Sequence, residues 1–124
     1  MQSDNTPEQV VQRQLNAYNN LNLDAWLATY APDARQYEHP ATLLASGHEQ
    51  IRARTAPRFQ EPNLHARLIQ RAVIGNLVVD YEQVTRSFPE GLGSVELTCI
   101  YEVRDGLIQT ASFIFGKKTL HADT

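Results

Sequence analysis

The feature that most constrains the fold is a change in the spacing of apolar residues near Leu64. Before this point apolar residues recur at helical spacing, and after it they alternate with polar residues, as in half-buried strands. The dipeptides Gly75-Asn76 and Asp105-Gly106 are typical of two-residue hairpin turns, and a longer loop lies at residues 89–93. The second half of the chain therefore predicts an antiparallel meander of long strands.

The first half predicts helices. Residues 6–9 (Thr-Pro-Glu-Gln) combine an N-cap threonine, a proline at the first helical position and a glutamine three residues after the cap. A short second helix is expected to end at Pro32, and a third to begin with a Ser46 and Glu49 capping box and end at Pro57. Helices followed by a meander predict an α+β fold, with the helices packed on one face of the sheet.

Length and composition exclude several classes of protein. A chain of 124 residues predicts one domain over 1–124. The net charge of -3 and the mixed signs argue against a nucleic-acid partner. We find no leader-like segment and no apolar run near the roughly 18 residues that span a bilayer, so we expect no membrane partner and a cytoplasmic location. Cys99 is the single cysteine and the histidines are scattered, so we expect no metal and no other cofactor.

Alternation in the last two strands indicates which side chains face inward. Leu97, Cys99 and Tyr101 belong to one apolar set, and Phe113 and Phe115 belong to another. Ile114, which lies between the two phenylalanines, is also apolar, so both faces of this strand have apolar character. Such a sheet needs a second covering layer, which predicts a homodimer through the outer sheet face.

The strand after Asn76 allows two registers. The favoured register turns the odd-numbered side chains inward, among them Tyr81 and Gln83. The alternative, through a one-residue bulge, would turn charged side chains inward: Asp80, Glu82 and Arg86. We favour the first because burying three charged groups without partners costs several kcal/mol.

Two residues are candidates for proton chemistry. His39 can exchange a proton near neutral pH and precedes Pro40, which holds the backbone before it extended. Its alternative reading is a hydrogen-bonded structural histidine. Tyr101 could donate a hydrogen bond to a developing oxyanion, or it could bond to backbone or water as buried tyrosines commonly do.

Aromatic and basic side chains suggest binding roles that an ordinary core or surface would also explain. An aromatic wall for a flat apolar ligand would come from four residues: Tyr18, Trp26, Tyr30 and Tyr37. Arginines of the third helical region would either meet an acidic ligand or form a solvated face: Arg52, Arg54 and Arg58.

The order helix, helix, strand, helix and meander is accompanied by short motifs along nearly the whole chain. These are Pro7-Glu8, Val10-Val11-Gln12-Arg13, Leu23-Asp24, Glu38-His39-Pro40, Ser46-Gly47, Ile51-Arg52 and Phe115-Gly116-Lys117-Lys118. In these features the chain resembles the ketosteroid isomerase branch of the nuclear transport factor 2-like (SnoaL-like) superfamily. The resemblance implies a cone-like fold with a curved sheet wrapped around the N-terminal helices, a hydrophobic pocket and commonly a homodimer.

The isomerase catalytic set is replaced here. In that family an aspartate before the proline of the first strand moves the proton, while a tyrosine and a protonated aspartate hold the oxyanion. By position these three become His39, Gln14 and Tyr101. The resemblance implies a cofactor-free isomerase, cyclase or dehydratase acting on a small apolar or carbonyl-containing molecule. His39 would be its base or acid and Tyr101 its oxyanion donor, with Gln14 or Tyr18 assisting.

The expected pocket would be lined by Tyr18, Trp26, Tyr30, Tyr37, Tyr81, Gln83, Leu97, Cys99, Phe113 and Phe115. The alternative function is a non-catalytic ligand-binding or dimerisation domain, in which His39 and Tyr101 satisfy one another or a water. Unpaired inward polar groups around a cavity would favour the enzyme, and a fully paired interior would favour the alternative.

Overall fold

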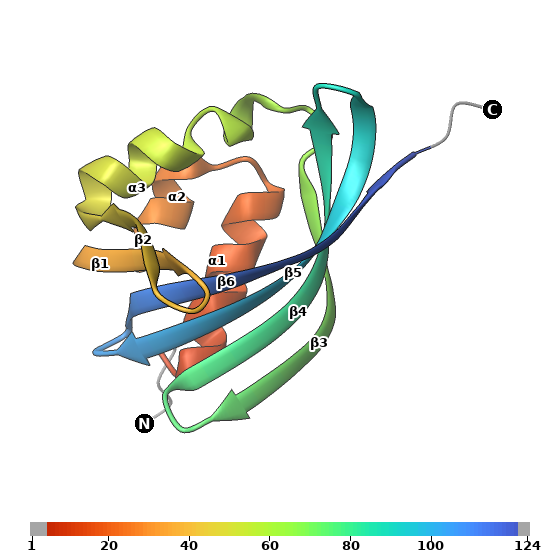
Figure 1. The fold of residues 1–124 in the computed structure, drawn as a ribbon. Coiled ribbons are helices and arrows are strands. Elements are labelled where there is room, and N and C mark those ends of the chain that lie inside the picture. The colour runs from red at the N-terminus through yellow and green to blue at the C-terminus, as the bar shows by residue number, and fades with distance from the viewer. Residues whose placement is uncertain (1–4, 122–124) are drawn as a thin grey trace.

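The structure is a computed structural model that describes residues 5–121. The expected domain over 1–124 extends beyond these residues at both ends and stays a prediction. Figure 1 shows the arrangement of the helices and strands. Their bounds are α1 Pro7–Asn19, α2 Leu23–Leu27, β1 Tyr30–Glu38, β2 Thr42–Ser46, α3 Gly47–Thr55, a 3-10 turn Arg58–Gln60, β3 His65–Ile74, β4 Leu77–Phe88, β5 Gly91–Arg104 and β6 Leu107–Leu120.

All six strands belong to one curved sheet in the order β2-β1-β6-β5-β4-β3. Neighbouring strands are antiparallel except β1 and β6, which are parallel. The sheet bends around α1, while α2 and α3 lie toward the end formed by β1 and β2 (Figure 1). This arrangement confirms the predicted α+β fold, in which a mainly antiparallel sheet wraps around the N-terminal helices.

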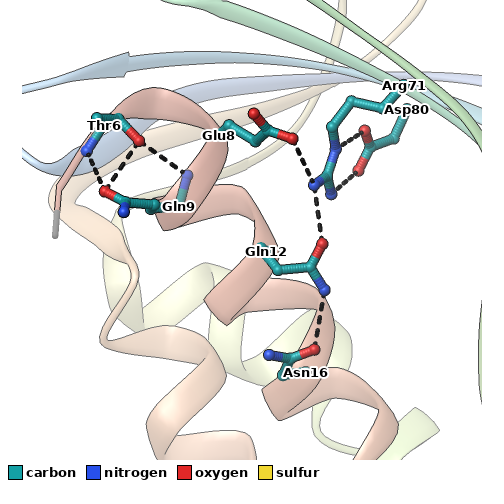
Figure 2. A network of polar contacts seen from close by, with 7 residues as sticks. All are labelled: Thr6, Glu8, Gln9, Gln12, Asn16, Arg71 and Asp80. Carbon is teal, nitrogen blue, oxygen red and sulfur yellow. Dashed lines mark hydrogen bonds and ion pairs between the residues drawn. The ribbon is translucent and has the colours of Figure 1, made fainter.

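Local sequence signals explain the start of α1 and the two hairpin turns. Thr6 and Gln9 form the predicted capping box: the Gln9 amide donates to Thr6 Oγ1 at 3.3 Å, and the Thr6 amide donates to Gln9 Oε1 at 3.1 Å (Figure 2). At the turns, Gly75 and Gly106 have positive φ angles of 60° and 74°, which glycine adopts without steric cost. These short-range features place α1 and the four long strands as predicted.

The second helix is shorter than predicted. It ends at Leu27, and Tyr30 already begins β1, so Pro32 lies inside a strand rather than at a helix end. The ladder of β1 with β6 is interrupted between Tyr30 and Arg35, and the pairing of β1 with β2 begins only at Arg35. Proline fits this unpaired stretch because it has no amide hydrogen to donate.

The predicted capping box of the third helix is wrong. Ser46 is the N-cap of α3, but its side chain makes no capping hydrogen bond. Instead the Ser46 amide donates to Gln50 Oε1 at 2.8 Å. Gly47 turns the chain from β2 into α3 with a φ of 84°, a conformation that side chains with a Cβ rarely adopt. The helix ends at Thr55, before Pro57, as predicted.

The favoured register of β4 is also wrong. Tyr81 and Gln83 face the outer side of the sheet. The buried positions are the even-numbered ones: Val78, Asp80, Glu82 and Val84. No bulge in β4 is needed, because the strand pairs continuously with β5 from Leu77 to Phe88. Burying a charge is tolerable here because Arg71 Nε and Nη2 donate to the two Asp80 carboxylate oxygens at 2.7 and 2.9 Å.

Candidate functional site

A cavity lies between the helices and the concave face of the sheet. Its walls come from α1, α2, α3 and the 3-10 turn on one side, and from β1 and β3 to β6 on the other. The empty space is about 430 Å³ including the open mouth, of which the centre of a water molecule can occupy about 40 Å³. One water needs roughly 10–15 Å³ on the latter measure. The cavity as it stands therefore fits a few water-sized groups, and a larger ligand has to displace side chains at the mouth.

Most of the predicted apolar lining is found in this cavity. Tyr18 comes from α1, Trp26 from α2 and Tyr30 from the start of β1. The ring centroids of Trp26 and Tyr30 are 4.8 Å apart, and Phe59 closes the cluster at 5.3 Å from Tyr18 and 5.7 Å from Trp26. From the sheet the lining includes three further predicted residues: Leu97, Cys99 and Phe113.

Four predicted lining residues lie elsewhere. Tyr37 follows the inward-facing Gln36 on β1 and is half-buried outside the cavity. Phe115 packs near Phe113, with ring centroids 6.3 Å apart, but it is 44% exposed and does not reach the cavity wall. Tyr81 and Gln83 face away from it because of the register of β4. The Tyr81 hydroxyl donates to Glu96 Oε2 at 2.9 Å.

The structure does not bring His39 together with the other two predicted catalytic residues. His39 is exposed in the turn after β1, and its backbone amide donates to the Phe113 carbonyl at 2.8 Å. The reason is the alternation of β1, which turns Ala34 and Gln36 inward and ends at Glu38, so that His39 lies past the rim. Gln36 is therefore a cavity residue that sequence reasoning missed. Alternation counted from an inward His39 could not have found it, because steps of two lead to Tyr37 and Arg35 on the opposite face.

Gln14 and Tyr101 both line the cavity. Gln14 projects from α1 and Tyr101 from β5, and both side chains are buried. Burial raises the pKa of Tyr101 well above its usual range, and the neighbouring Cys99 adds to the effect. Burial likewise raises the pKa of the Cys99 thiol. At neutral pH both groups keep their protons, so Tyr101 is a hydrogen-bond donor and Cys99 is not a thiolate nucleophile.

Glu82 is the second cavity residue that the favoured sequence register missed. It is 4% exposed, and its carboxyl group makes no hydrogen bond or ion pair with any residue in the described range 5–121. Burial, reinforced by the negative charge of Asp80, raises the pKa of Glu82 to about 8, although the positive charge of Arg71 opposes the shift. A carboxyl with this pKa can give or take a proton near neutral pH.

Five buried polar atoms of the described chain lack a hydrogen-bond partner, and all five belong to residues of this cavity. They are Gln14 Oε1, Trp26 Nε1, Tyr30 Oη, Gln36 Nε2 and Arg58 Nε. An unpaired buried polar group costs about 1–3 kcal/mol, so folded proteins keep few of them. These atoms are therefore available to form hydrogen bonds with a ligand or with water inside the cavity.

Two half-buried arginines lie in the cavity wall. Arg54 Nη1 donates to Gln36 Oε1 at 3.1 Å, and its guanidinium carbon lies 5.6 Å from the centre of the Phe113 ring. Arg58 lines the same cavity from the 3-10 turn. Arg52, the third arginine considered from the sequence, points elsewhere and pairs with Asp24 at 2.6 Å.

Two other kinds of site find no support in the described residues. Between Asn5 and His121 no three histidine, cysteine, aspartate or glutamate side chains are grouped so that they could hold a metal ion. The helices found in that range are also too short or too polar to cross a membrane.

Several solved structures have the same fold as this chain. An uncharacterized cystatin-fold protein from Novosphingobium aromaticivorans has a TM-score of 0.80 and 21% identity, over 88% of this chain and 97% of that one. A putative SnoaL-like polyketide cyclase from Jannaschia sp. CCS1 has a TM-score of 0.76 and 21% identity, over 93% and 90%. A hypothetical protein with a ketosteroid isomerase-like fold from Catenulispora acidiphila, in complex with trimethylamine, has a TM-score of 0.74 and 17% identity, over 87% and 85%.

These identities are low enough that the likeness shows the fold alone. No match was found among curated proteins. The family model of the SnoaL-like domain, however, matches residues 11–111, which is most of the sequence. The match confirms the resemblance seen in the sequence motifs, and the chain belongs to the SnoaL-like domain family.

Proposed function

We propose that the cavity is the active site of a cofactor-free enzyme that moves a proton next to a carbonyl group of a small molecule, with Glu82 as its acid and base. The single observation that carries this proposal is the Glu82 carboxyl itself. It is buried, faces the cavity and has no partner among residues 5–121. An inward carboxyl that only stabilised the fold would have a partner, as Asp80 has.

The chemistry follows from the groups around Glu82. Its carboxylate form takes the proton from the carbon beside the carbonyl, and its acid form returns that proton to the same or a neighbouring carbon. The negative charge that develops on the carbonyl oxygen needs hydrogen-bond donors. Tyr101 and Tyr30 offer buried hydroxyl groups in the same cavity, and among residues 5–121 the Tyr30 hydroxyl has the Gln36 amide nearby but no hydrogen bond of good geometry. An isomerase, a cyclase or a dehydratase can be built on these steps.

The test is the rate at which solvent deuterium enters small ketones and oxo acids, followed by proton NMR. Glu82→Gln should lower this rate by roughly 10²- to 10⁴-fold, the usual contribution of a positioned acid or base. Glu96→Gln is the matched control, because Glu96 lies on the neighbouring strand, binds Tyr81 on the outer face and does not line the cavity. An equal rate in wild type and Glu82→Gln would refute the role of Glu82.

A non-catalytic ligand-binding domain is the second candidate. The five unpaired polar atoms favour it as much as they favour an enzyme, because a tightly held ligand would satisfy them without reacting. The two candidates differ in one measurable way. A binding domain would be stabilised by a ligand in a thermal-shift assay, yet it would exchange no protons in that ligand.

Two expectations from the sequence remain part of the proposal. The outer sheet face exposes apolar side chains, including Ile74, Leu77 and Ile114, which a second copy of the chain would cover. Light scattering should then give twice the mass of one chain, and Leu77→Lys should halve it, whereas Leu43→Lys on the distant strand β2 should not. We also expect the protein in the cytoplasm, which blotting of cell fractions would test.

A further inference from the structure

The charges of the cavity are unbalanced at its mouth. Four arginines of the described chain are half-buried: Arg54, Arg58, Arg71 and Arg86. Arg71 pairs with Asp80 at 2.7 Å, and Arg86 pairs with Glu61 at 2.7 Å. Arg54 and Arg58, the two that line the cavity, have no carboxylate within 4.0 Å among residues 5–121. The fold therefore neutralises its partly buried guanidinium groups everywhere except in the cavity wall.

The guanidinium groups of Arg54 and Arg58, neither of which has a carboxylate partner, also act on one another. Burial lowers the pKa of Arg54, and the positive charge of Arg58 lowers it further. Tyr30, Tyr18 and, least of the three, Glu38 oppose this lowering of the Arg54 pKa. Placing two like charges together in a partly desolvated site costs free energy, and an anion between them would recover it.

No other group of the cavity supplies the missing negative charge at neutral pH. Burial raises the pKa of Glu82 to about 8, and burial raises the pKa of Tyr18 to about 12 against the opposing effects of Arg58 and Arg86. Both groups are therefore mainly neutral at pH 7. Arg58 in addition keeps Nε buried without any hydrogen-bond acceptor.

We propose that the cavity binds a small organic carboxylate that also carries a carbonyl group, with the carboxylate held by Arg54 and Arg58. A guanidinium is planar and matches the two oxygens of a carboxylate, so Arg58 Nε would gain the acceptor that it lacks. The apolar part of the ligand would lie against Trp26, Leu97 and Phe113. Its carbonyl would then lie toward Tyr101 and Glu82. This inference rests on the proposed function, because it names the substrate class of that same site.

The test compares matched acids and esters as ligands. The probes are 4-oxopentanoate and 4-oxo-4-phenylbutanoate, each against its neutral methyl ester, with binding followed by calorimetry in a buffer free of other carboxylates. We expect at least one of the acids to bind, and to bind at least about tenfold more tightly than its ester, as the loss of a charged hydrogen-bond pair would predict. Equal binding of acid and ester, or no binding of either acid, would overturn the inference.

Variants of Arg54 and Arg58 test whether these two side chains hold the carboxylate. Arg54→Met and Arg58→Met should each weaken acid binding about tenfold or more and leave ester binding unchanged. Arg58→Lys, which keeps the charge but loses the planar fork, should fall between wild type and Arg58→Met. Arg52→Met is the control, because Arg52 lies on the same helix as Arg54 but pairs with Asp24 outside the cavity. Undiminished acid binding in both methionine variants would overturn the inference.

The same samples separate this inference from the proposed function. If the acids bind through Arg54 and Arg58 but no deuterium enters them, the ligand class stands and the proton-transfer function fails. If the acids bind no more tightly than their esters but deuterium enters small ketones through Glu82, the function stands and the ligand class fails.

Discussion

Asp80 and Glu82 lie two residues apart on β4, face the same side of the sheet and are almost equally buried, at 0% and 4% exposure. Asp80 receives two hydrogen bonds from Arg71, which also donates to Gln12 Oε1 of α1 at 2.8 Å (Figure 2). Glu82 receives none and faces the cavity. Burial alone therefore does not distinguish a carboxylate that stabilises the fold from the one to which we assign proton transfer. Our assignment rests on the missing partner of Glu82.

Asp80 also influences Glu82 directly. The Arg71 and Asp80 pair joins β3, β4 and α1, so it holds together the wall from which Glu82 projects. The Asp80 charge contributes to the raised pKa of Glu82, after burial. One carboxylate thus anchors the site and helps to keep its neighbour protonated.

The largest effect on stability should follow from breaking the paired carboxylate. Asp80→Asn leaves Arg71 with only the more distant carboxylate of Glu8, at 3.8 Å, and should cost about 3 kcal/mol of unfolding free energy, measured by urea denaturation. Glu82→Gln should make the protein more stable at pH 7, because the raised pKa obliges Glu82 to take up a proton on folding, a cost that the neutral amide does not carry. The double variant Asp80→Leu with Arg71→Met should recover much of the loss. Equal destabilisation by Asp80→Asn and Glu82→Gln would remove the distinction.

The second effect is a pH dependence that belongs to Glu82. Its pKa rises from 4.5 to about 8 on folding, so between these values the folded state binds more protons than the unfolded state. Stability must then fall as pH rises through this window, by at most about 1.4 kcal/mol per pH unit, and level off above pH 8. The difference in unfolding free energy between wild type and Glu82→Gln isolates this contribution. A difference that does not change with pH would show that Glu82 has an ordinary pKa.

A smaller effect should distinguish two glutamines of α1 that are also two residues apart. Gln14 Oε1 is buried without a partner, so Gln14→Met should stabilise the ligand-free protein by about 1 kcal/mol. Gln12 accepts a hydrogen bond from Arg71 and donates to Asn16 at 2.9 Å, so Gln12→Met should destabilise it by a similar amount. Thermal melts of the two variants give the comparison. Shifts of the same sign would contradict it.

The smallest effect is expected at His39. Because its side chain is exposed outside the cavity, His39→Ala should change the unfolding free energy by less than about 0.5 kcal/mol. The rate of deuterium exchange should change less than about twofold, in contrast to the large loss expected for Glu82→Gln. A loss on the scale of 10² in His39→Ala would restore His39 to the site and would require the mouth of the cavity to close over it.

Short-range patterns predicted much of the fold and part of the site. The Thr6 capping box, the turns at Gly75 and Gly106 and the order of the long strands depend on residues a few positions apart, and all are found. The inward set of β5 was equally readable, and it placed Leu97, Cys99 and Tyr101. The capping-box pattern at Ser46 gave a wrong prediction, because the N-cap amide donates to Gln50 rather than to the predicted Glu49.

The sequence by itself determined the helix starts, the turns, the alternation of the strands and the family to which the chain belongs. Only the tertiary structure decided which side chains of β4 face inward. The sequence of that strand fits either register, and the register adopted depends on Arg71 from another strand and on its contact with α1. The unpaired state of Glu82 has the same origin, because the cavity that it faces is lined by α1, α2, α3, the 3-10 turn and five strands, none of which supplies a partner. A local pattern records what a residue prefers, but burial and pairing depend on the elements that the fold brings around it.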